Sequence, residues 1–164
     1  MKMNSTHNKL TENIRGQSID ILNTHLAAAI DLHGQLKQAH WNVRGPAFIA
    51  IHELFDKVAD KVEEYSDMLA ERVGALGGAA LGGVNTVSAK TFLKPYPLEI
   101  ADEKSHVEAV SAALAVFAQS AREAIDQTAD FGDAVTADLM TEITRDLDQQ
   151  LWFVESHNPH RQIL

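Results

Sequence analysis

Four long stretches of this sequence carry apolar side chains at intervals of three and four residues, and this periodicity decides the fold class. Residues three and four apart lie on one face of an α-helix, so each stretch predicts an amphipathic helix with one buried face. The predicted helices are residues 11–39, residues 47–74, a third from Asp102 or Ser105 to a turn at 131–133, and a fourth from Val135 that Pro159 ends. The chain is therefore predicted to be all-α.

The connection between the second and third helices is much longer than the others. Residues 77–102 are punctuated by six glycines and prolines, with a short helical turn expected at about 87–92. Neighbouring antiparallel helices need only a short loop, whereas this segment can run the length of a bundle and make the second and third helices parallel. One long crossover is typical of ferritin-like bundles, so a ferritin-like four-helix bundle is predicted.

Two helix starts carry capping signals. Ser105 and Glu108 have the spacing of a capping box, in which a hydroxyl and a carboxylate satisfy backbone N–H groups of the first turn. Asp133 is a candidate N-cap for the last helix because its carboxylate can accept from the same kind of N–H group.

Length and composition exclude several classes of protein. The 164 residues suit a single domain, 1–164, with residues 1–10 expected to form a mobile tail. The absence of cysteine excludes disulfides and thiolate ligands, and a net charge of −9 disfavours binding to a phosphate backbone. No apolar run approaches membrane-spanning length and the N-terminus lacks the apolar core of an export signal, so a cytoplasmic protein is expected.

Histidine and carboxylate side chains gather between residues 40 and 71. The pairs His52/Asp56 and Asp67/Glu71 are each spaced four apart, which puts both members on one face of a helix, and His40 ends the preceding helix. Neutral imidazole and carboxylate together suit divalent iron or zinc. These five residues are the predicted metal-binding and catalytic residues.

The spacing between the two pairs constrains how such a site could form. On one continuous helix His52 and Asp67 are separated by about 22 Å, which no single metal centre spans. Either the two pairs serve different sites, or a second copy of the chain closes the gap. A two-fold axis near Val62, with the two helices antiparallel, would bring His52/Asp56 of one protomer beside Asp67/Glu71 of the other.

The segments HWNVRGPAFIAIHELFD and DMLAERVGALGG resemble the Dps family, the small ferritins of bacteria. The segment TADLMTEITRDLDQQLWFVESH extends this resemblance over nearly the whole chain. The resemblance implies a dodecameric homo-oligomeric shell with ferroxidase centres between two-fold-related subunits. It implies that His40, His52 and Asp56 come from one subunit and that Asp67 and Glu71 come from its mate.

The resemblance also implies an activity. It is the oxidation of Fe(II), commonly by hydrogen peroxide, followed by storage of ferric mineral inside the shell as a defence against oxidative stress. An oxygen-rich site with open positions suits Fe(II) and favours the harder Fe(III) product, and Zn(II) is an alternative occupant. The family's three-fold iron-entry pores would lie near Asp133, Asp138 and Glu142.

Other residues carry separate expectations. His33 is a candidate extra ligand, although a hydrogen-bonded core histidine is the favoured interpretation. Trp41 matches the tryptophan that lies beside the iron in the family, but Trp41 and Trp152 are expected first of all to pack. The remaining histidines are expected on the surface or in the tails, namely His7, His25, His106, His157 and His160.

Two other function classes stay open. One is a nucleoid-compacting DNA binder, and the other is a shell that binds zinc or another metal without turnover. Lys2, Lys9 and Arg161 are few cations for a DNA-binding arm, so DNA binding is expected to be weak or absent.

Overall fold

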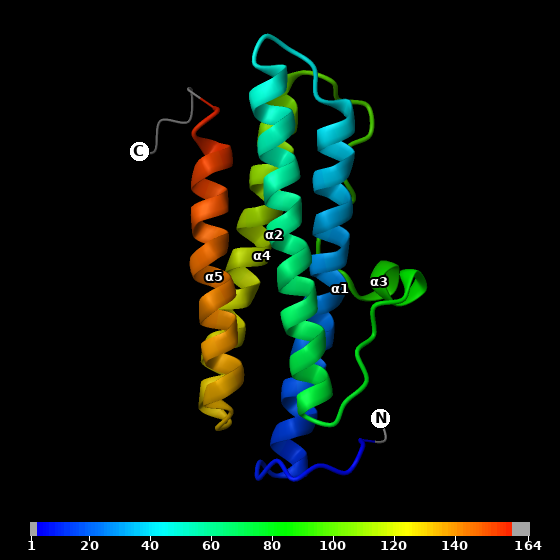
Figure 1. The fold of residues 1–164 in the computed structure, drawn as a ribbon, viewed down its shortest axis with the longest axis vertical. Helices are drawn as coiled ribbons and strands as arrows, with labels where there is room; N and C mark the ends of the chain where they lie inside the picture. Colours follow the sequence, from blue (N-terminus) through cyan, green and yellow to red (C-terminus); the bar gives the residue numbers. More distant parts are fainter. Residues whose placement is uncertain (1–2, 159–164) are drawn as a thin grey trace.

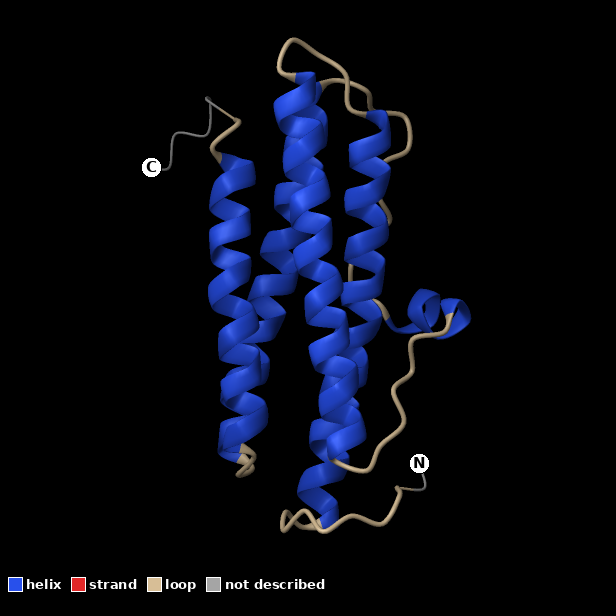
Figure 2. Ribbon diagram, in the orientation of Figure 1, coloured by secondary structure: helices blue, strands red, loops and turns tan. Residues whose placement is uncertain are grey.

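The computed structural model describes residues 3–158, and this range contains five helices and no strand (Figures 1 and 2). The four long helices are α1 (Glu12–Asn42), α2 (Phe48–Ala75), α4 (Glu103–Asp130) and α5 (Ala134–Glu155), and the short α3 (Val84–Lys90) lies between α2 and α4. The predicted all-α fold with a short helix in the crossover is confirmed.

The helices form two antiparallel pairs, α1 with α2 and α4 with α5 (Figure 1). The crossover leaves the end of α2, carries α3 beside α1 and returns along the bundle to the start of α4, so α2 and α4 run in the same direction. This is the predicted topology of a ferritin-like bundle.

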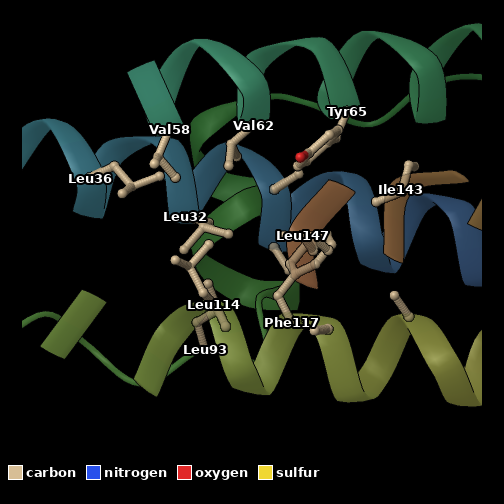
Figure 3. Packing of buried hydrophobic residues seen from close by; sticks show 14 of the residues in the cluster. Leu32, Leu36, Val58, Val62, Tyr65, Leu93, Leu114, Phe117, Ile143 and Leu147 are labelled. Carbon is tan, nitrogen blue, oxygen red and sulfur yellow. The ribbon is translucent and has the colours of Figure 1, made fainter. Parts of the chain in front are cut away.

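The core is built from the apolar faces that the periodicity identified (Figure 3). Every long helix contributes side chains that are almost completely excluded from solvent, and the crossover adds Leu93, which is 7% exposed. Buried members from the four long helices include Leu32, Leu36, Val58, Val62, Leu114, Phe117, Ile143 and Leu147. Burial of such side chains contributes about 1.5–3 kcal/mol each, which makes this shared core the main stabilising term.

Polar side chains of α1 hold the crossover against the bundle. Asn23 donates from Nδ2 to the carbonyl oxygen of Ala79 at 3.2 Å and accepts at Oδ1 from the N–H of Leu81 at 2.9 Å. Farther along, the Thr91 hydroxyl donates to Asp31 at 2.6 Å. These bonds tie the crossover to α1 and give partners to partly buried polar groups of the loop.

Helix boundaries differ from the prediction by a few residues. Helix α1 continues to Asn42 rather than 39 and ends where Val43 becomes extended, so His40 lies inside its last turn. Helix α3 begins at Val84 rather than near 87 and ends at Lys90, where Thr91 becomes extended and bonds to Asp31.

The predicted capping box at Ser105 is wrong. Asp102 is the N-cap of α4, and its carboxylate accepts from the N–H of Ser105 at 2.9 Å and from the Ser105 hydroxyl at 2.6 Å. Ser105 therefore lies within the first turn and not before it, and Asp102 takes the role that the spacing had assigned to Ser105.

Asp133 is confirmed as the N-cap of α5, but its predicted place in a pore is wrong. The residue is 1% exposed. Its carboxylate accepts from the Ser18 hydroxyl at 2.6 Å, from Arg72 at 2.9 Å and from the N–H of Thr136 at 3.1 Å. All its acceptor capacity is used inside the protomer, where it joins three long helices. Asp138 and Glu142 are exposed.

Two histidines expected on the surface are buried. His25 is 5% exposed and bonds to the carbonyl oxygen of Ile21 at 2.8 Å and to the Ser120 hydroxyl at 3.1 Å. Burial lowers its pKa. His106 is 1% exposed and bonds to the Tyr96 hydroxyl at 2.7 Å. Both lie between α4 and another element, a placement that single-helix periodicity does not reveal.

The prediction held for His7 and His157, which are exposed, whereas Lys2, Pro159, His160 and Arg161 lie outside the described residues. Within residues 3–158, no helix has the length and apolar character needed to cross a bilayer.

Replacing Asp133 with Asn should destabilise the bundle by about 3 kcal/mol at neutral pH, because a buried carboxylate paired with Arg72 is lost. Burial by itself raises the pKa of Asp133, but the bonds from Ser18 and Thr136 and the charge of Arg72 outweigh it and hold the pKa below its ordinary value. The wild-type advantage should therefore be complete above about pH 4 and shrink as the pH falls further. Urea unfolding of both proteins at several pH values measures this, and an advantage that grew toward low pH would contradict it.

Candidate metal centre

The short turn between α1 and α2 brings two of the predicted ligands together. His40, in the last turn of α1, lies against His52, in the second turn of α2. Their imidazole rings are stacked, with centroids 3.7 Å apart and planes inclined by 19°. Two residues separated by twelve positions in the sequence thus form one compact pair.

The pair is locked by reciprocal hydrogen bonds. Nδ1 of His40 lies 2.8 Å from the carbonyl oxygen of His52, and Nδ1 of His52 lies 2.8 Å from the carbonyl oxygen of His40. A carbonyl oxygen only accepts, so each Nδ1 carries the hydrogen in the neutral imidazole. Each Nε2 therefore keeps its lone pair. A carbonyl oxygen that accepts from one ring nitrogen in this way fixes the direction of the other nitrogen, as it does for metal-binding histidines in proteins.

Asp56 lies one turn farther along α2, with Oδ1 3.9 Å from Nε2 of His40. The ammonium group of Lys37, on α1, is bonded to the same carboxylate oxygen. This hydrogen bond lowers the pKa of Asp56, and the neighbouring charges of His40, Lys37 and His52 act in the same direction. A cation thus already occupies the carboxylate that the prediction assigns to a metal ion.

Asp67 and Glu71 are not brought to this group. They lie farther along the same uninterrupted helix and are exposed to solvent, with Asp67 about 22 Å and Glu71 about 28 Å from His52. Asp67 borders an open groove of about 670 Å³ that is also lined by Leu26, Ile30 and Ala70. Within one protomer, no three histidine or carboxylate side chains in residues 3–158 come close enough together to hold a metal ion.

Exposed apolar side chains flank the histidine pair. Trp41 is 66% exposed and Ile49 61%, and the ring of Phe48 lies against His52 with a centroid distance of 5.0 Å. The expectation that Trp41 and Trp152 pack is wrong for the single protomer, since Trp152 is 63% exposed as well. The prediction failed because helical periodicity does not separate a face that packs within a protomer from one that is left outside it.

His33 lies on α1 two turns before His40 and is half-buried. It forms no hydrogen bond or ion pair among the residues that the structure describes, so the interpretation as a hydrogen-bonded core histidine is not supported. Its possible role as an extra ligand stays a prediction.

Comparison with known proteins places this geometry in a family. Residues 19–159 match the family model of the ferritin-like domain. The chain is 45% identical to the DNA protection during starvation protein of Agrobacterium fabrum over 157 residues, 96% of this chain and 97% of that protein. The chain belongs to the Dps family of ferritin-like proteins.

Solved Dps structures support the same assignment. The tetragonal form of Mycobacterium smegmatis Dps is 29% identical and superposes with a TM-score of 0.90, covering 95% of this chain and 94% of that one. Dps from Microbacterium arborescens, described as "in the high iron form", is 33% identical with a TM-score of 0.83, covering 90% of this chain and 95% of that one. The bundle and its crossover are therefore those of known Dps proteins.

Lys37 is the residue at this centre that the sequence analysis missed. It lies three residues before His40, so both face the same side of α1, and this spacing was the available signal. Because a protonated lysine cannot bind a divalent cation, the spacing of metal ligands does not identify it.

Replacing Lys37 with Met should tighten Zn(II) binding to the oligomer by about threefold, because the metal no longer has to displace an ammonium group from Asp56. Isothermal titration calorimetry measures the affinity. Lys57→Met is the matched control, since Lys57 lies one residue from Asp56 and has no ion pair within residues 3–158. Equal tightening in both variants would indicate a change in net charge alone, and an unchanged affinity in Lys37→Met would contradict the prediction.

Proposed function

We propose that this protein oxidises Fe(II) at centres shared between two-fold-related subunits and stores the ferric product inside a hollow shell. The observation that carries the proposal is the reciprocal bonding of His40 and His52, which leaves both Nε2 atoms available beside the carboxylate of Asp56. These three residues form one half of the proposed site.

The other half is supplied by the partner. Helix α2 is continuous from Phe48 to Ala75, so Asp67 and Glu71 cannot reach the histidine pair of their own protomer. An antiparallel α2 from a second copy would bring them there, and symmetry would form two such centres at each contact. The exposed apolar side chains of Trp41 and Ile49 beside the histidines support burial of this region against another subunit.

The residues suit iron as a substrate. Two imidazole nitrogens and three carboxylates leave coordination positions open for an oxidant, and the carboxylates stabilise the additional charge of the product. Two Fe(II) ions supply the two electrons that reduce one hydrogen peroxide to two waters with two protons, so no hydroxyl radical is released. Zn(II) would bind the same ligands without turnover.

The proposed assembly is a cytoplasmic dodecamer, as the Dps resemblance implies. Iron is the expected cargo, in line with the high-iron form described for the Microbacterium arborescens protein. Asp138 and Glu142, both exposed at the start of α5, stay candidates for an entry pore now that Asp133 is excluded.

Asp67→Ala and His52→Ala should each abolish most peroxide-driven Fe(II) oxidation, followed by near-ultraviolet absorbance, while the oligomer persists. The sharper test mixes the two chains. A hybrid dimer of one chain of each kind contains one intact centre and one that lacks both residues. Random assembly should therefore restore about one quarter of the wild-type activity.

Three results would decide against parts of this proposal. Normal activity in Asp67→Ala would exclude that residue. No recovery in the hybrids would indicate centres formed within single protomers. Wild-type protein that binds Fe(II) but does not oxidise it with peroxide or dioxygen would be a passive metal-binding shell.

A second candidate function is direct protection of DNA, and the name of the Agrobacterium fabrum relative, DNA protection during starvation protein, favours it. Two features of this chain oppose it. The net charge is −9, and the described part of the N-terminal segment is docked on the bundle, where the N–H of Asn4 donates to the carbonyl oxygen of Gly77 at 2.8 Å. A docked segment with few cations is a poor DNA-binding arm.

The oligomer should therefore leave the mobility of plasmid DNA unchanged in a gel-shift assay at low salt. Retention of the plasmid in the well, reversed by added salt, would establish DNA binding and overturn this expectation.

A further inference from the structure

The carboxylate of Glu103, which is not among the proposed ligands, contacts the turn between the two helices that carry His40 and His52. Glu103 lies in the first turn of α4, and its Oε1 accepts from the N–H of Ala47 at 2.5 Å. Ala47 is the N-cap position of α2. Fifty-six positions separate the two residues in the sequence. The same negative charge therefore stands at the N-terminal ends of two long helices, where the helix dipoles favour an anion.

Helix α2 has no cap of its own. Its N-cap residue is an alanine, which makes no side-chain hydrogen bond, and its first turn contains no acidic residue. An uncapped helix start leaves backbone N–H groups without partners, and its first turn frays. Glu103 supplies from α4 an acceptor for the N–H of Ala47, whereas the N–H of Phe48 donates to the carbonyl oxygen of Gly45 at 3.1 Å.

The turn is shaped to admit this carboxylate. A Cβ atom placed on Gly45 would overlap the Glu103 carboxyl group, so a side chain at this position would displace the carboxylate from Ala47. The neighbouring backbone is tied to the same segment, because the N–H of Arg44 donates to the carbonyl oxygen of Ala101 at 2.9 Å. The end of the crossover and the start of α4 thus bond to the α1–α2 turn at two points.

The conformation of the first turn of α2 affects the positions of both histidine rings. Phe48, the first residue of α2, lies against the ring of His52, and His52 exchanges hydrogen bonds with His40. Fraying of the first turn would release Phe48 and let the carbonyl oxygen of His52 move away from Nδ1 of His40. Both Nε2 atoms would then lose their fixed direction.

We propose that Glu103 is a positioning residue for the His40–His52 pair, acting through the start of α2 without touching the metal. The inference rests on the proposed function for its consequence, since it concerns how well the half-site is organised to bind a divalent cation. The cap itself depends only on the contacts within the protomer.

Three variants of the full oligomer test this role. Glu103→Ala removes the acceptor, Glu103→Gln keeps an acceptor oxygen but not the charge, and Glu108→Ala, the matched control, removes a carboxylate farther along α4 that pairs with Lys104. Zn(II) affinity is measured by calorimetry, the KM for Fe(II) and kcat by oxidation kinetics, and amide hydrogen exchange over residues 47–52 by mass spectrometry.

Glu103→Ala should weaken Zn(II) binding about fivefold, the effect of losing a typical helix cap, and raise the KM for Fe(II) with little change in kcat. Exchange over residues 47–52 should become faster, Glu103→Gln should largely restore all three readouts, and Glu108→Ala should leave them near wild type. Equal effects of Glu103→Ala and Glu108→Ala, or wild-type Zn(II) affinity in Glu103→Ala, would overturn the proposal. If wild-type protein itself bound no metal at His40 and His52, the proposed function would fail, whereas the exchange result would still report on the cap.

Discussion

The straightness of α2 is the constraint from which the rest follows. A helix that runs without interruption from Phe48 to Ala75 keeps its two ends apart, so His52 and Asp67 can never meet within one protomer. Histidine and carboxylate side chains nevertheless suit one iron centre. Because α2 holds the two sets of proposed ligands apart, the proposed centre can form only where a second α2 lies antiparallel to the first. In that arrangement the protomer is a stable scaffold and the subunit contact is the reactive part.

The half-site itself depends on the tight turn between α1 and α2. The two imidazoles donate to each other's backbone carbonyl oxygens, so main-chain atoms hold both rings in place. Lys37 pairs with Asp56, and this hydrogen bond lowers the pKa of the carboxylate. Glu103 steadies the turn from the far end of the crossover. A long connection that first looks like a mere link between helix pairs therefore also supports the proposed site.

Buried polar groups give the bundle its uniqueness. Apolar faces of similar shape could slide past one another by a turn, but Asp133 accepts from Ser18 on α1 and Arg72 on α2 while it caps α5, and only one register satisfies all three. Asn23 and Asp31 do the same for the crossover. Breaking one such contact leaves a buried charge or amide without partners, which costs more than the contact itself contributes.

The sequence alone determined the helices, their approximate ends, the long crossover and the five candidate ligands, because periodicity and short spacings are local properties that a helix converts directly into faces and distances. It could not assign Asp133, whose carboxylate suits a cap or a pore equally well until Ser18 and Arg72 are seen around it. It also missed the burial of His25 and His106, the ammonium of Lys37 on Asp56, and the reach of Glu103 to Ala47. Those contacts join residues far apart in the chain, and only the packing of one helix against another decides which of many polar side chains meet.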